Sequence, residues 1–378
     1  MVSLNRHKGK VALVADVDDT SVGVSLVRLQ KGAAEILKSK RASLPLEKRT
    51  TDHSAHAVAP LLEESATSIV KDAGVAISAS FAILHAPWTR FRTAEAEEKF
   101  DTPRVITKDL IDALTKKALS TPSDFNQTNI LETGVMHVYL NGYPTATPLK
   151  KHAAAAAVVA YESEVNPEIQ RMVTEVLTKI LPGRIPVVRS STCALLAVLN
   201  EHLPDIHRFV ILDVGSNATE CAVILREALV QTALVPEGSN TILARIAEGA
   251  PPEEKLSELR MLADDSCSSD SCKALKDSLA RAEPELTKQF GEAFAKLASK
   301  RRLPNTAMLA APAELTPYLQ SFFSRIDFSQ FTATAQPLSV ESLSAEHLTN
   351  VARSSSSAPS DTGVCIAAGY VNILEQTA

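Results

Sequence analysis

FVILDVGSNATECAVI, residues 209–224, consists of two apolar runs joined by a short polar segment that opens on Asp213 and Gly215. Apolar runs on both sides of a polar turn predict two β-strands joined by a tight turn. The polar atoms of the turn would then gather at one end of the strand pair. The same pattern occurs near the start of the chain, where residues 11–29 read VALVADVDDTSVGVSLVRL, with Asp16 near the end of the first apolar run.

Two such hairpins indicate an internal duplication, in which each half of the chain presents an acidic, hydroxyl-bearing turn to a shared cleft. A single hairpin of this kind is common in α/β proteins, so the argument depends on the second copy. The arrangement resembles the actin-like ATPase superfamily, in which two turns hold the phosphates of a nucleotide from opposite sides. The resemblance implies a duplicated actin-like (ribonuclease-H-like) α/β fold with two lobes around a cleft.

The composition is that of a globular protein. The chain has 378 residues, enough for two or three domains, and 45% of them are hydrophobic. A formal net charge of -5 and scattered Lys and Arg residues argue against a nucleic-acid partner. No apolar run is long enough for a membrane helix, and the first residues do not have the pattern of a signal peptide. We therefore expect a cytoplasmic protein without direct membrane insertion.

Cysteine and glycine usage add two constraints. The five cysteines are scattered, which argues against a disulfide framework. Cys267 and Cys272 lie close together, but no second Cys or His pair completes a zinc site. The chain has 13 glycines, whereas roughly 26 are typical of this length. So few glycines are unusual for a fold that cradles phosphates.

The first half of the chain follows the order of elements in one branch of the superfamily. Residues 33–39 predict a third strand, and residues 55–74 an amphipathic helix that ends at Gly74. The strand at residues 80–85 leads into Ala-Pro-Trp at 86–88. This strand end resembles the point at which the FtsA and PilM branch leaves its first subdomain. FtsA is a bacterial cell-division protein, and PilM is a cytoplasmic component of type IV pilus assembly.

A small inserted α+β subdomain follows in that branch, and residues 99–161 correspond to it. Thr107 is a good N-cap for a helix, residues 129–140 predict a strand, and residues 141–144 (NGYP) a turn. Residues 150–161 contain five consecutive alanines, whose propensity favours a helix. The resemblance implies a strand there, and we follow it.

The resemblance also gives the domain limits and the remaining elements. The predicted domains are a first actin-like domain over 1–98 and 162–205, the inserted subdomain over 99–161, a second actin-like domain over 206–362 and a closing helix over 363–378. The predicted helices lie at 166–181, 192–199, 237–247, 251–262, 284–300 and 315–323. The predicted strands lie at 185–188, 229–235 and 306–310. Residues 264–271 predict a surface loop, and residues 354–361 a flexible insert.

The resemblance implies a nucleotide site made of four segments, with ATP and Mg²⁺ as cofactors, and three of these segments carry the candidate residues. In the family, glycines let backbone N–H groups approach the phosphates, hydroxyl groups donate hydrogen bonds, and the leading aspartates hold Mg²⁺ through water. The candidate Mg²⁺ ligands are Asp16 and Asp213. The candidate cofactor-binding residues are Asp16, Asp18, Asp19, Thr20 and Ser21 in the first turn, Asp213, Gly215, Ser216, Asn217 and Thr219 in the second, and Gly238, Ser239 and Asn240 at a helix start.

The first turn departs from the family pattern. Val17, Asp18 and Asp19 follow Asp16, where the family has a glycine two residues after its aspartate. A carboxylate about 4 Å from a phosphate costs about 4 kcal/mol at an effective dielectric constant of about 20, unless a metal lies between them. Asp18 or Asp19 would therefore be either an extra Mg²⁺ ligand or part of a solvated turn.

The other nucleotide segments depart as well. The second turn carries side chains at residues 216–220 where backbone would approach the ligand. Leu243 and Arg245 stand where the family has a threonine and an aspartate. The loop at 310–312 reads Ala-Ala-Pro instead of being glycine-rich, and Pro312 has no N–H to donate. These departures predict that the chain keeps the actin-like fold while its nucleotide chemistry is reduced or lost. The alternative is a divergent member of the superfamily that still binds ATP.

No Ser/His/Asp or Cys/His arrangement indicates another enzyme. The resemblance implies a PilM-like cytoplasmic scaffold of type IV pilus assembly, recruited to the inner membrane by a partner whose cytoplasmic peptide it binds. The peptide groove would lie where residues 99–161 join the first domain, and self-association is a further expectation. The alternatives are an ATP-binding actin-like ATPase and an FtsA-like cell-division adaptor. The adaptor is disfavoured because no terminal amphipathic helix follows the closing helix.

Overall fold

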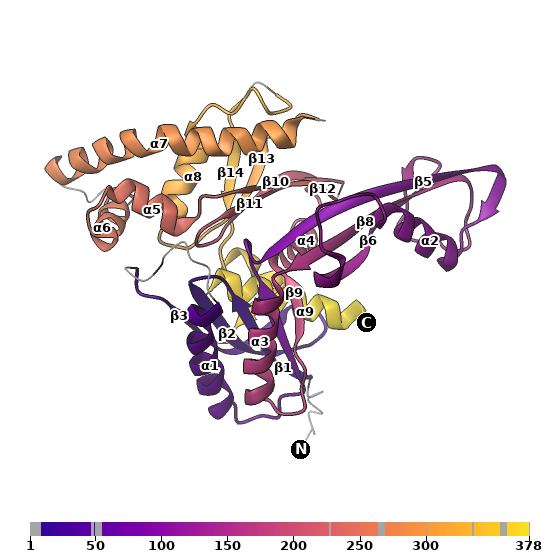
Figure 1. Ribbon diagram of the computed structural model, residues 1–378, viewed down its shortest axis with the longest axis horizontal. Coiled ribbons are helices and arrows are strands. Elements are labelled where there is room, and N and C mark those ends of the chain that lie inside the picture. Colours follow the sequence, from indigo (N-terminus) through magenta and orange to yellow (C-terminus); the bar gives the residue numbers. More distant parts are fainter. Residues whose placement is uncertain are drawn as a thin grey trace, which may run out of the picture.

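The two predicted hairpins are the central strand pairs of two separate sheets in the computed structural model of the protein (Figure 1). Strand β1 (Val11–Val17) pairs with β2 (Ser21–Arg28), and β10 (Arg208–Val214) pairs with β11 (Thr219–Leu225), both in antiparallel register. The structure describes residues 9–46, 49, 55–226, 228–263, 269–299, 301–334, 336–355 and 361–377.

Both sheets repeat one topology. Their strand orders are β15-β3-β2-β1-β4-β9 and β12-β11-β10-β13-β14. In each, the hairpin has an antiparallel strand on one side and two parallel strands on the other. The flanking strands are β3 (Ala34–Ser43), β4 (Ala79–Leu84) and β9 (Val187–Ser190) in the first sheet, and β12 (Ala228–Val235), β13 (Thr306–Ala310) and β14 (Ser339–Ser342) in the second. The predicted duplication is therefore confirmed.

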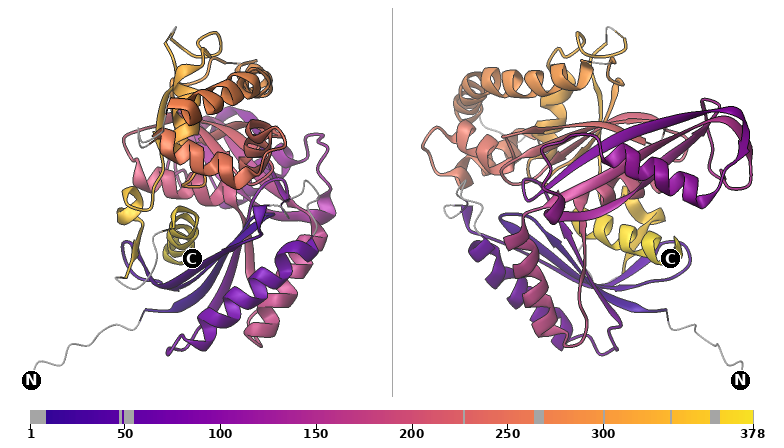
Figure 2. Two further views of the ribbon diagram at one scale, coloured as in Figure 1. Left: turned by 90° about the vertical axis from the view of Figure 1, so that its left-hand side faces the viewer. Right: turned by 45° about the vertical axis from the view of Figure 1, so that its right-hand side comes forward.

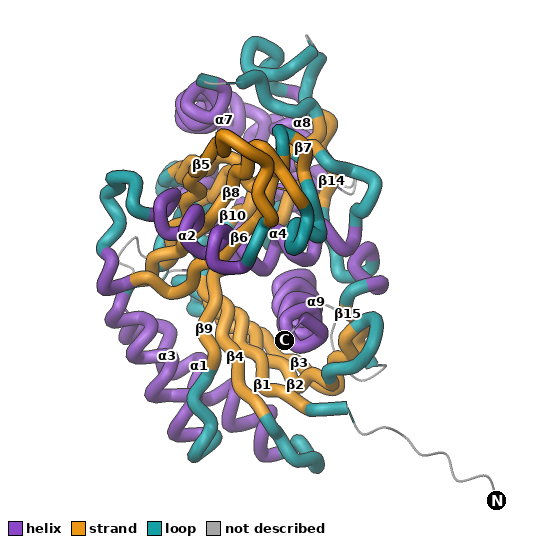
Figure 3. Tube along the Cα trace, turned by 90° about the vertical axis from the view of Figure 1, so that its right-hand side faces the viewer, coloured by secondary structure: helices purple, strands orange, loops and turns teal. Residues whose placement is uncertain are grey.

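Four helices cover the first sheet. Helices α1 (Ala55–Lys71) and α3 (Pro167–Ile180) lie on its outer face, whereas α4 (Ser191–His202) and α9 (Thr362–Thr377) lie between the two sheets (Figures 2 and 3). One hydrophobic cluster contains buried residues of both sheets together with those of α4 and α9. The two lobes thus share a continuous apolar core.

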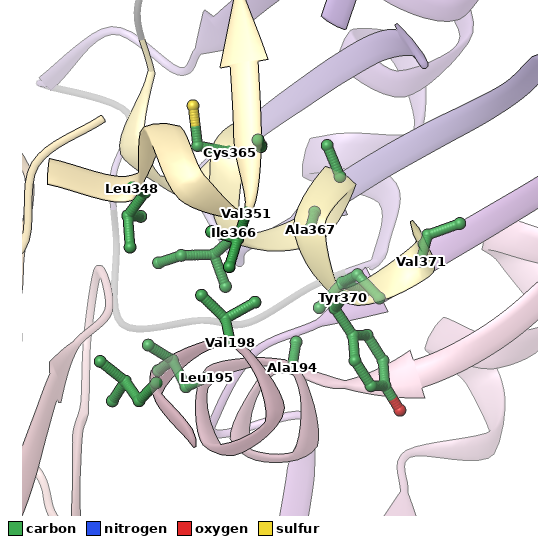
Figure 4. Close-up of a cluster of buried hydrophobic side chains, with 14 of the residues drawn as sticks. Ala194, Leu195, Val198, Leu348, Val351, Cys365, Ile366, Ala367, Tyr370 and Val371 are labelled. Carbon is green, nitrogen blue, oxygen red and sulfur yellow. The ribbon is translucent and has the colours of Figure 1, made fainter. Parts of the chain in front are cut away.

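Small side chains allow α4 and α9 to pack closely. Ala194 and Val198 of α4 lie opposite Ile366 and Tyr370 of α9 (Figure 4). A Cβ atom added at Gly369 would lie 3.4 Å from the Val198 side chain, so this contact leaves little room for a larger residue. The closing helix predicted from residues 363–378 is confirmed, and it packs into the shared core.

The outer face of the second sheet carries helices α5 to α8. Edge-to-face ring pairs join α7 to α8 and to the segment after α8: Phe290 and Phe323 have centroids 4.8 Å apart, as do Phe294 and Phe328. All four of these rings are fully buried. The helices are α5 (Ser239–Ala247), α6 (Pro252–Ala263), α7 (Ser269–Ala298) and α8 (Thr316–Arg325).

A third sheet projects sideways from the two lobes (Figure 1). Its strand order is β5-β8-β6-β7, and α2 (Lys108–Leu119) packs on one face. The strands are β5 (Thr89–Val105), β6 (Ile130–Leu140), β7 (Tyr143–Pro144) and β8 (His152–Val165). The predicted limits at Lys99 and Tyr161 lie inside β5 and β8, because both strands continue without a turn toward the first lobe.

The alanine run forms a strand, as the resemblance implied. Strand β8 lies between β5 and β6, so its backbone is paired on both sides. Ala156, Val158 and Ala160 pack in the cluster beneath α2. Pairing and burial therefore outweigh the helical propensity of alanine.

Three predictions need correction or addition. Helix α7 begins at Ser269 and contains Pro284, so the predicted helix start at Pro284 is wrong, and the predicted loop is helical from Ser269. The predicted strand at 185–188 lies two residues later, as β9. Strand β15 (Ala352–Ser354) pairs with β3, so the chain rejoins the first sheet before residue 362. Two ranges discussed in the sequence analysis lie outside the described residues: 264–268, which include Cys267, and 356–360.

No helix in the described part of the chain has the length and apolar content needed to cross a membrane.

Candidate functional site

The two turns meet at the boundary between the lobes because of strand register. In the first sheet β1 is parallel to β4, with Asp16 beside Ile83, and in the second β10 is parallel to β13, with Asp213 beside Ala310. Neighbouring parallel strands end at the same edge of a sheet, which is where α/β folds place their sites. Here the two edges face each other across a cavity of about 410 Å³.

Most of the predicted site residues line this cavity. They are Asp16, Asp18, Thr20, Ser21, Asp213, Gly215, Ser216, Ser239 and Asn240. The other candidates are Asp19, Asn217, Thr219 and Gly238, which are not among the lining residues. Asp19, Asn217 and Thr219 are buried within the turns themselves, and Gly238 is the N-cap of α5.

Side chains of the two turns bond directly to each other. Thr20 Oγ1 donates to Ser216 Oγ at 2.6 Å, and Ser216 Oγ donates to Asp18 Oδ2 at 2.7 Å. Asn217 Nδ2 donates to Asp19 Oδ2 at 2.6 Å. Burial and the neighbouring Asp18 carboxylate raise the pKa of Asp19 to about 8. The space between the turns is therefore closed by hydrogen bonds from one lobe to the other.

Several backbone N–H groups at the turns and at the start of α5 also have partners within the protein. Gly215 N donates to Ala218 O at 2.9 Å, and Asp18 N donates to Ser21 O at 2.9 Å. At the start of α5, Ser239 N donates to Gly215 O and Asn240 N donates to Ser216 O, both at 2.8 Å. These are positions from which a phosphate-binding loop would present its donors.

Asp16 is held by two cationic side chains that the sequence did not single out. Arg41 Nη2 donates to Asp16 Oδ2 at 2.5 Å, and His85 Nε2 lies 2.7 Å from Asp16 Oδ1. Burial of Asp16 acts to raise its pKa, but the charges and hydrogen bonds of His85 and Arg41 outweigh this and hold the pKa well below its usual range. The same Arg41 also donates from Nε to Asp361 Oδ2 at 2.5 Å.

His85 connects the two candidate metal ligands. Its Nδ1 lies 3.6 Å from Asp213 Oδ2, on the opposite side of the ring from Asp16. Ser191 Oγ, at the start of α4, donates to the same Asp213 oxygen at 3.3 Å. Burial acts to lower the pKa of His85, but Asp16 and Asp213 raise it well above 6.5. In the described residues, no group of three or more His, Cys, Asp or Glu side chains is placed to hold a metal ion.

The far end of the cavity has a more apolar wall. Leu243 and the loop at 310–312, including Pro312, line it. Arg245 does not line it, and its guanidinium bonds to the buried Glu237 carboxylate. Arg49 reaches this end, where its Nη1 donates to Asn240 Oδ1 at 3.2 Å.

Sequence reasoning missed eight polar residues of the cavity wall: Arg41, Ser43, Arg49, His85, Ser191, Glu314, Asp361 and Thr362. One sequence signal points to His85, because it directly follows β4 at the predicted strand end. Arg41 lies in the interior of β3, and its side chain reaches Asp16 across β2 only because of the register that places Arg41 opposite Gly23. No local pattern in the sequence marks that contact.

The repeated strand order and the two facing turns define an actin-like ATPase fold, in agreement with the prediction. No protein-family model matches the chain, and no curated protein matches its sequence. Among solved structures, the chain is similar to a chain of the PilM–PilN type IV pilus biogenesis complex. The TM-score is 0.62 at 13% identity, covering 95% of this chain and 97% of that one. Because the match covers nearly the whole chain, it includes most of the third sheet, and the fold is PilM-like.

A second solved structure is the ethanolamine utilization protein EutJ from Carboxydothermus hydrogenoformans. Its TM-score is 0.44 at 11% identity, covering 97% of this chain and 91% of that one.

Proposed function

We propose that the protein is a PilM-like scaffold of type IV pilus assembly, or of a related machine. It binds a cytoplasmic peptide of an inner-membrane partner, and its inter-lobe cavity is a degenerate nucleotide site. The observation that carries the proposal is the fold match of TM-score 0.62 over 95% of this chain. The matching chain comes from a complex named for two pilus-biogenesis proteins, PilM and PilN.

The contacts at the cavity argue against nucleotide turnover. Thr20, Ser216 and Asp18 bond to one another across the lobes, in the space where phosphates would lie between the turns. The Asp16 carboxylate already accepts hydrogen bonds from side chains of this chain. We infer that the residues present do not fit a Mg²⁺–nucleotide complex in this arrangement.

We place peptide binding at the junction of the third sheet with the first lobe. Glu132 of β6 fixes this junction, because its Oε1 accepts hydrogen bonds from Ser190 N at 3.0 Å and from Ser190 Oγ at 2.8 Å. Arg189 Nε lies 3.3 Å from Glu132 Oε2. Such contacts between β6 and β9 hold the two sheets in a fixed relation before any partner arrives.

Strand β9 is an edge strand of the first sheet, so one side of its backbone has no neighbouring strand among those described. Ile185, just before β9, is 80% exposed, and Val135 of β6 is 39% exposed. An extended peptide could add to this edge and place its apolar side chains against these residues. Backbone hydrogen bonds would supply affinity, and the side chains would supply specificity.

Calorimetry with a synthetic peptide tests this proposal. The peptide spans the cytoplasmic segment of the PilN-like inner-membrane protein from the same organism. We expect Ile185→Asp and Val135→Asp each to weaken binding by at least about tenfold, the equivalent of 1.4 kcal/mol. Val75→Asp, at a site 43% exposed in the loop after α1, is the matched control and should bind normally. If both variants bind normally, the groove lies elsewhere, and absence of binding by the unaltered protein contradicts the proposed function.

A further inference from the structure

Both aspartates expected to hold Mg²⁺ already have partners within this chain. The Asp16 side chain is 5% exposed, with Arg41 Nη2 at 2.5 Å from one oxygen and His85 Nε2 at 2.7 Å from the other. Asp213 Oδ2 faces His85 Nδ1 at 3.6 Å and Ser191 Oγ at 3.3 Å. A divalent cation that bound Asp16 directly would have to displace Arg41 or His85, and one that bound Asp213 Oδ2 would compete with His85 and Ser191.

Arg41 is fixed in place from several sides. Its Nε and Nη2 donate to the two oxygens of Asp361 at 2.5 and 3.0 Å, and its Nη1 donates to Ser21 Oγ at 3.1 Å. A Cβ atom added at Gly363 would lie 2.5 Å from Asp16 Oδ2 and 2.8 Å from Arg41 Nη2. The absence of a side chain at Gly363 is therefore needed for the start of α9 to close over this ion pair.

The charge of the cavity explains why a cationic side chain such as that of Arg41 is needed there. Five carboxylates line a single cavity: those of Asp16, Asp18, Asp213, Glu314 and Asp361. Like charges at this proximity repel, and removing them from water without a partner is costly. The guanidinium of Arg41 supplies the positive charge that a bound cation would otherwise supply. This charge is permanent, and the guanidinium also donates hydrogen bonds on several sides.

His85 adds a link between the lobes. Asp16 belongs to β1 of the first sheet and Asp213 to β10 of the second, and the ring of His85 lies between their carboxylates. A Mg²⁺ ion held by both turns would connect the same two groups. Arg41 and His85 together thus occupy the positions and provide the contacts expected of the metal.

We propose that Arg41 and His85 are resident substitutes for the divalent cation. They keep the two turns together, and the chain takes up no Mg²⁺ in this cavity. The proposal rests on the part of the proposed function that describes the cavity as a degenerate nucleotide site. It is independent of peptide binding.

Electron paramagnetic resonance with Mn²⁺ as the probe tests the proposal without any nucleotide. We expect the signal of free Mn²⁺ to be unchanged by the unaltered protein at equimolar concentration. The variant Arg41→Gln/His85→Gln keeps polar side chains but removes both cationic partners of Asp16 and the histidine beside Asp213. It should gain one Mn²⁺ site per chain, at least about tenfold tighter than any binding by the unaltered protein.

Two further variants locate the gained site. Adding Asp16→Asn to the double variant should abolish Mn²⁺ binding. The control Arg28→Gln/His347→Gln removes an ion-paired arginine on the first sheet and an exposed histidine outside the inter-lobe cavity, and it should gain no site.

Two results would overturn the proposal. One is stoichiometric Mn²⁺ binding by the unaltered protein that Asp16→Asn removes. The other is a double variant that is folded by circular dichroism and gains no site. If the double variant does not fold, the single variant Arg41→Gln decides the question by the same criterion. Peptide affinity of the unaltered protein is measured in parallel, so its absence would contradict the proposed function and leave the Mn²⁺ result standing.

Discussion

Glu220 of β11 is a buried carboxyl group next to the cavity wall. Its Oε2 accepts a hydrogen bond of 2.6 Å from Thr192 Oγ1. Burial raises the pKa of Glu220 to about 7, although the hydrogen bond from Thr192 acts in the opposite direction. In the unfolded chain a glutamate loses its proton near pH 4.3. The folded state therefore binds the proton more tightly, and the stability that this provides below about pH 4.3 is lost as the pH rises to about 7.

We expect Glu220→Gln to remove this pH-dependent loss, because glutamine has no proton to release and still offers an oxygen to Thr192. The variant should exceed the unaltered protein in free energy of unfolding by about 3 kcal/mol at pH 8, with only a small difference at pH 5. Urea denaturation at both pH values provides the measurement, and the exposed Glu346→Gln is the control. Parallel pH profiles for Glu220→Gln and the unaltered protein would contradict the prediction.

Single residues also mark the limit of what the sequence predicts at the site. Asp16, Asp213 and the hydroxyl groups of the turns were predictable because they directly follow apolar strands. Arg41 was not, because its approach to Asp16 depends on how β3 registers against β2. Register is a property of the whole sheet, so a single sequence does not determine which side chain from a neighbouring strand reaches a turn.

At the scale of elements, α7 gives the clearest contrast between local sequence and structure. A proline predicts a helix start, yet α7 continues through Pro284 for 30 residues in all. Buried apolar side chains recur every three or four positions on both sides of the proline, at Leu275, Leu279, Ala282, Leu286 and Phe290. This continuous apolar face, packed on the second lobe, stabilises the helix despite the missing hydrogen bond.

We therefore expect Pro284→Ala to stabilise the protein, by up to about 3 kcal/mol, since alanine restores the N–H and removes the ring from an exposed helix position. Thermal unfolding followed by circular dichroism measures the change. Gly291→Ala, in the same helix with nothing within 4 Å of the added Cβ, is a reference that should gain about 0.5–1 kcal/mol. If Pro284→Ala is neutral or destabilising, the helix starts at Pro284 and residues 269–283 are not part of it.

The order of elements was more predictable than their limits. We expected the two hairpins, the strand over the alanine run and the closing helix, because each corresponds to a position in the order of elements of the FtsA and PilM branch. Strands β5, β7, β14 and β15 were missed. Three of them have only two to four residues, too few for an alternating pattern to be detected. Strand β5 has 17 residues, but many of them are charged, so no apolar run marks it.

At the scale of the whole molecule, we expect no ATP turnover. Hydrogen bonds between the lobes close the space between the turns, and the N–H groups of Asp18, Gly215, Ser239 and Asn240 donate within the protein. Phosphate release from Mg-ATP should equal that of a buffer control. Asp213→Ala should give the same rate. Release above the control that disappears in Asp213→Ala would contradict the degenerate site.

The completion of the first lobe has a consequence for the synthesis of the protein. Strands β1, β2 and β3 lie within residues 11–43, but the segments that finish their sheet and cover its inner face, β15 and α9, lie at residues 352–377. We therefore expect the inner apolar face of these strands to be incompletely covered in a nascent chain until α9 has been translated. Exposed strands of this kind are prone to wrong pairing. We therefore expect the early part of the chain to need protection by chaperones during translation. The strands of the second lobe all follow residue 207, so their pairing does not wait for a distant segment.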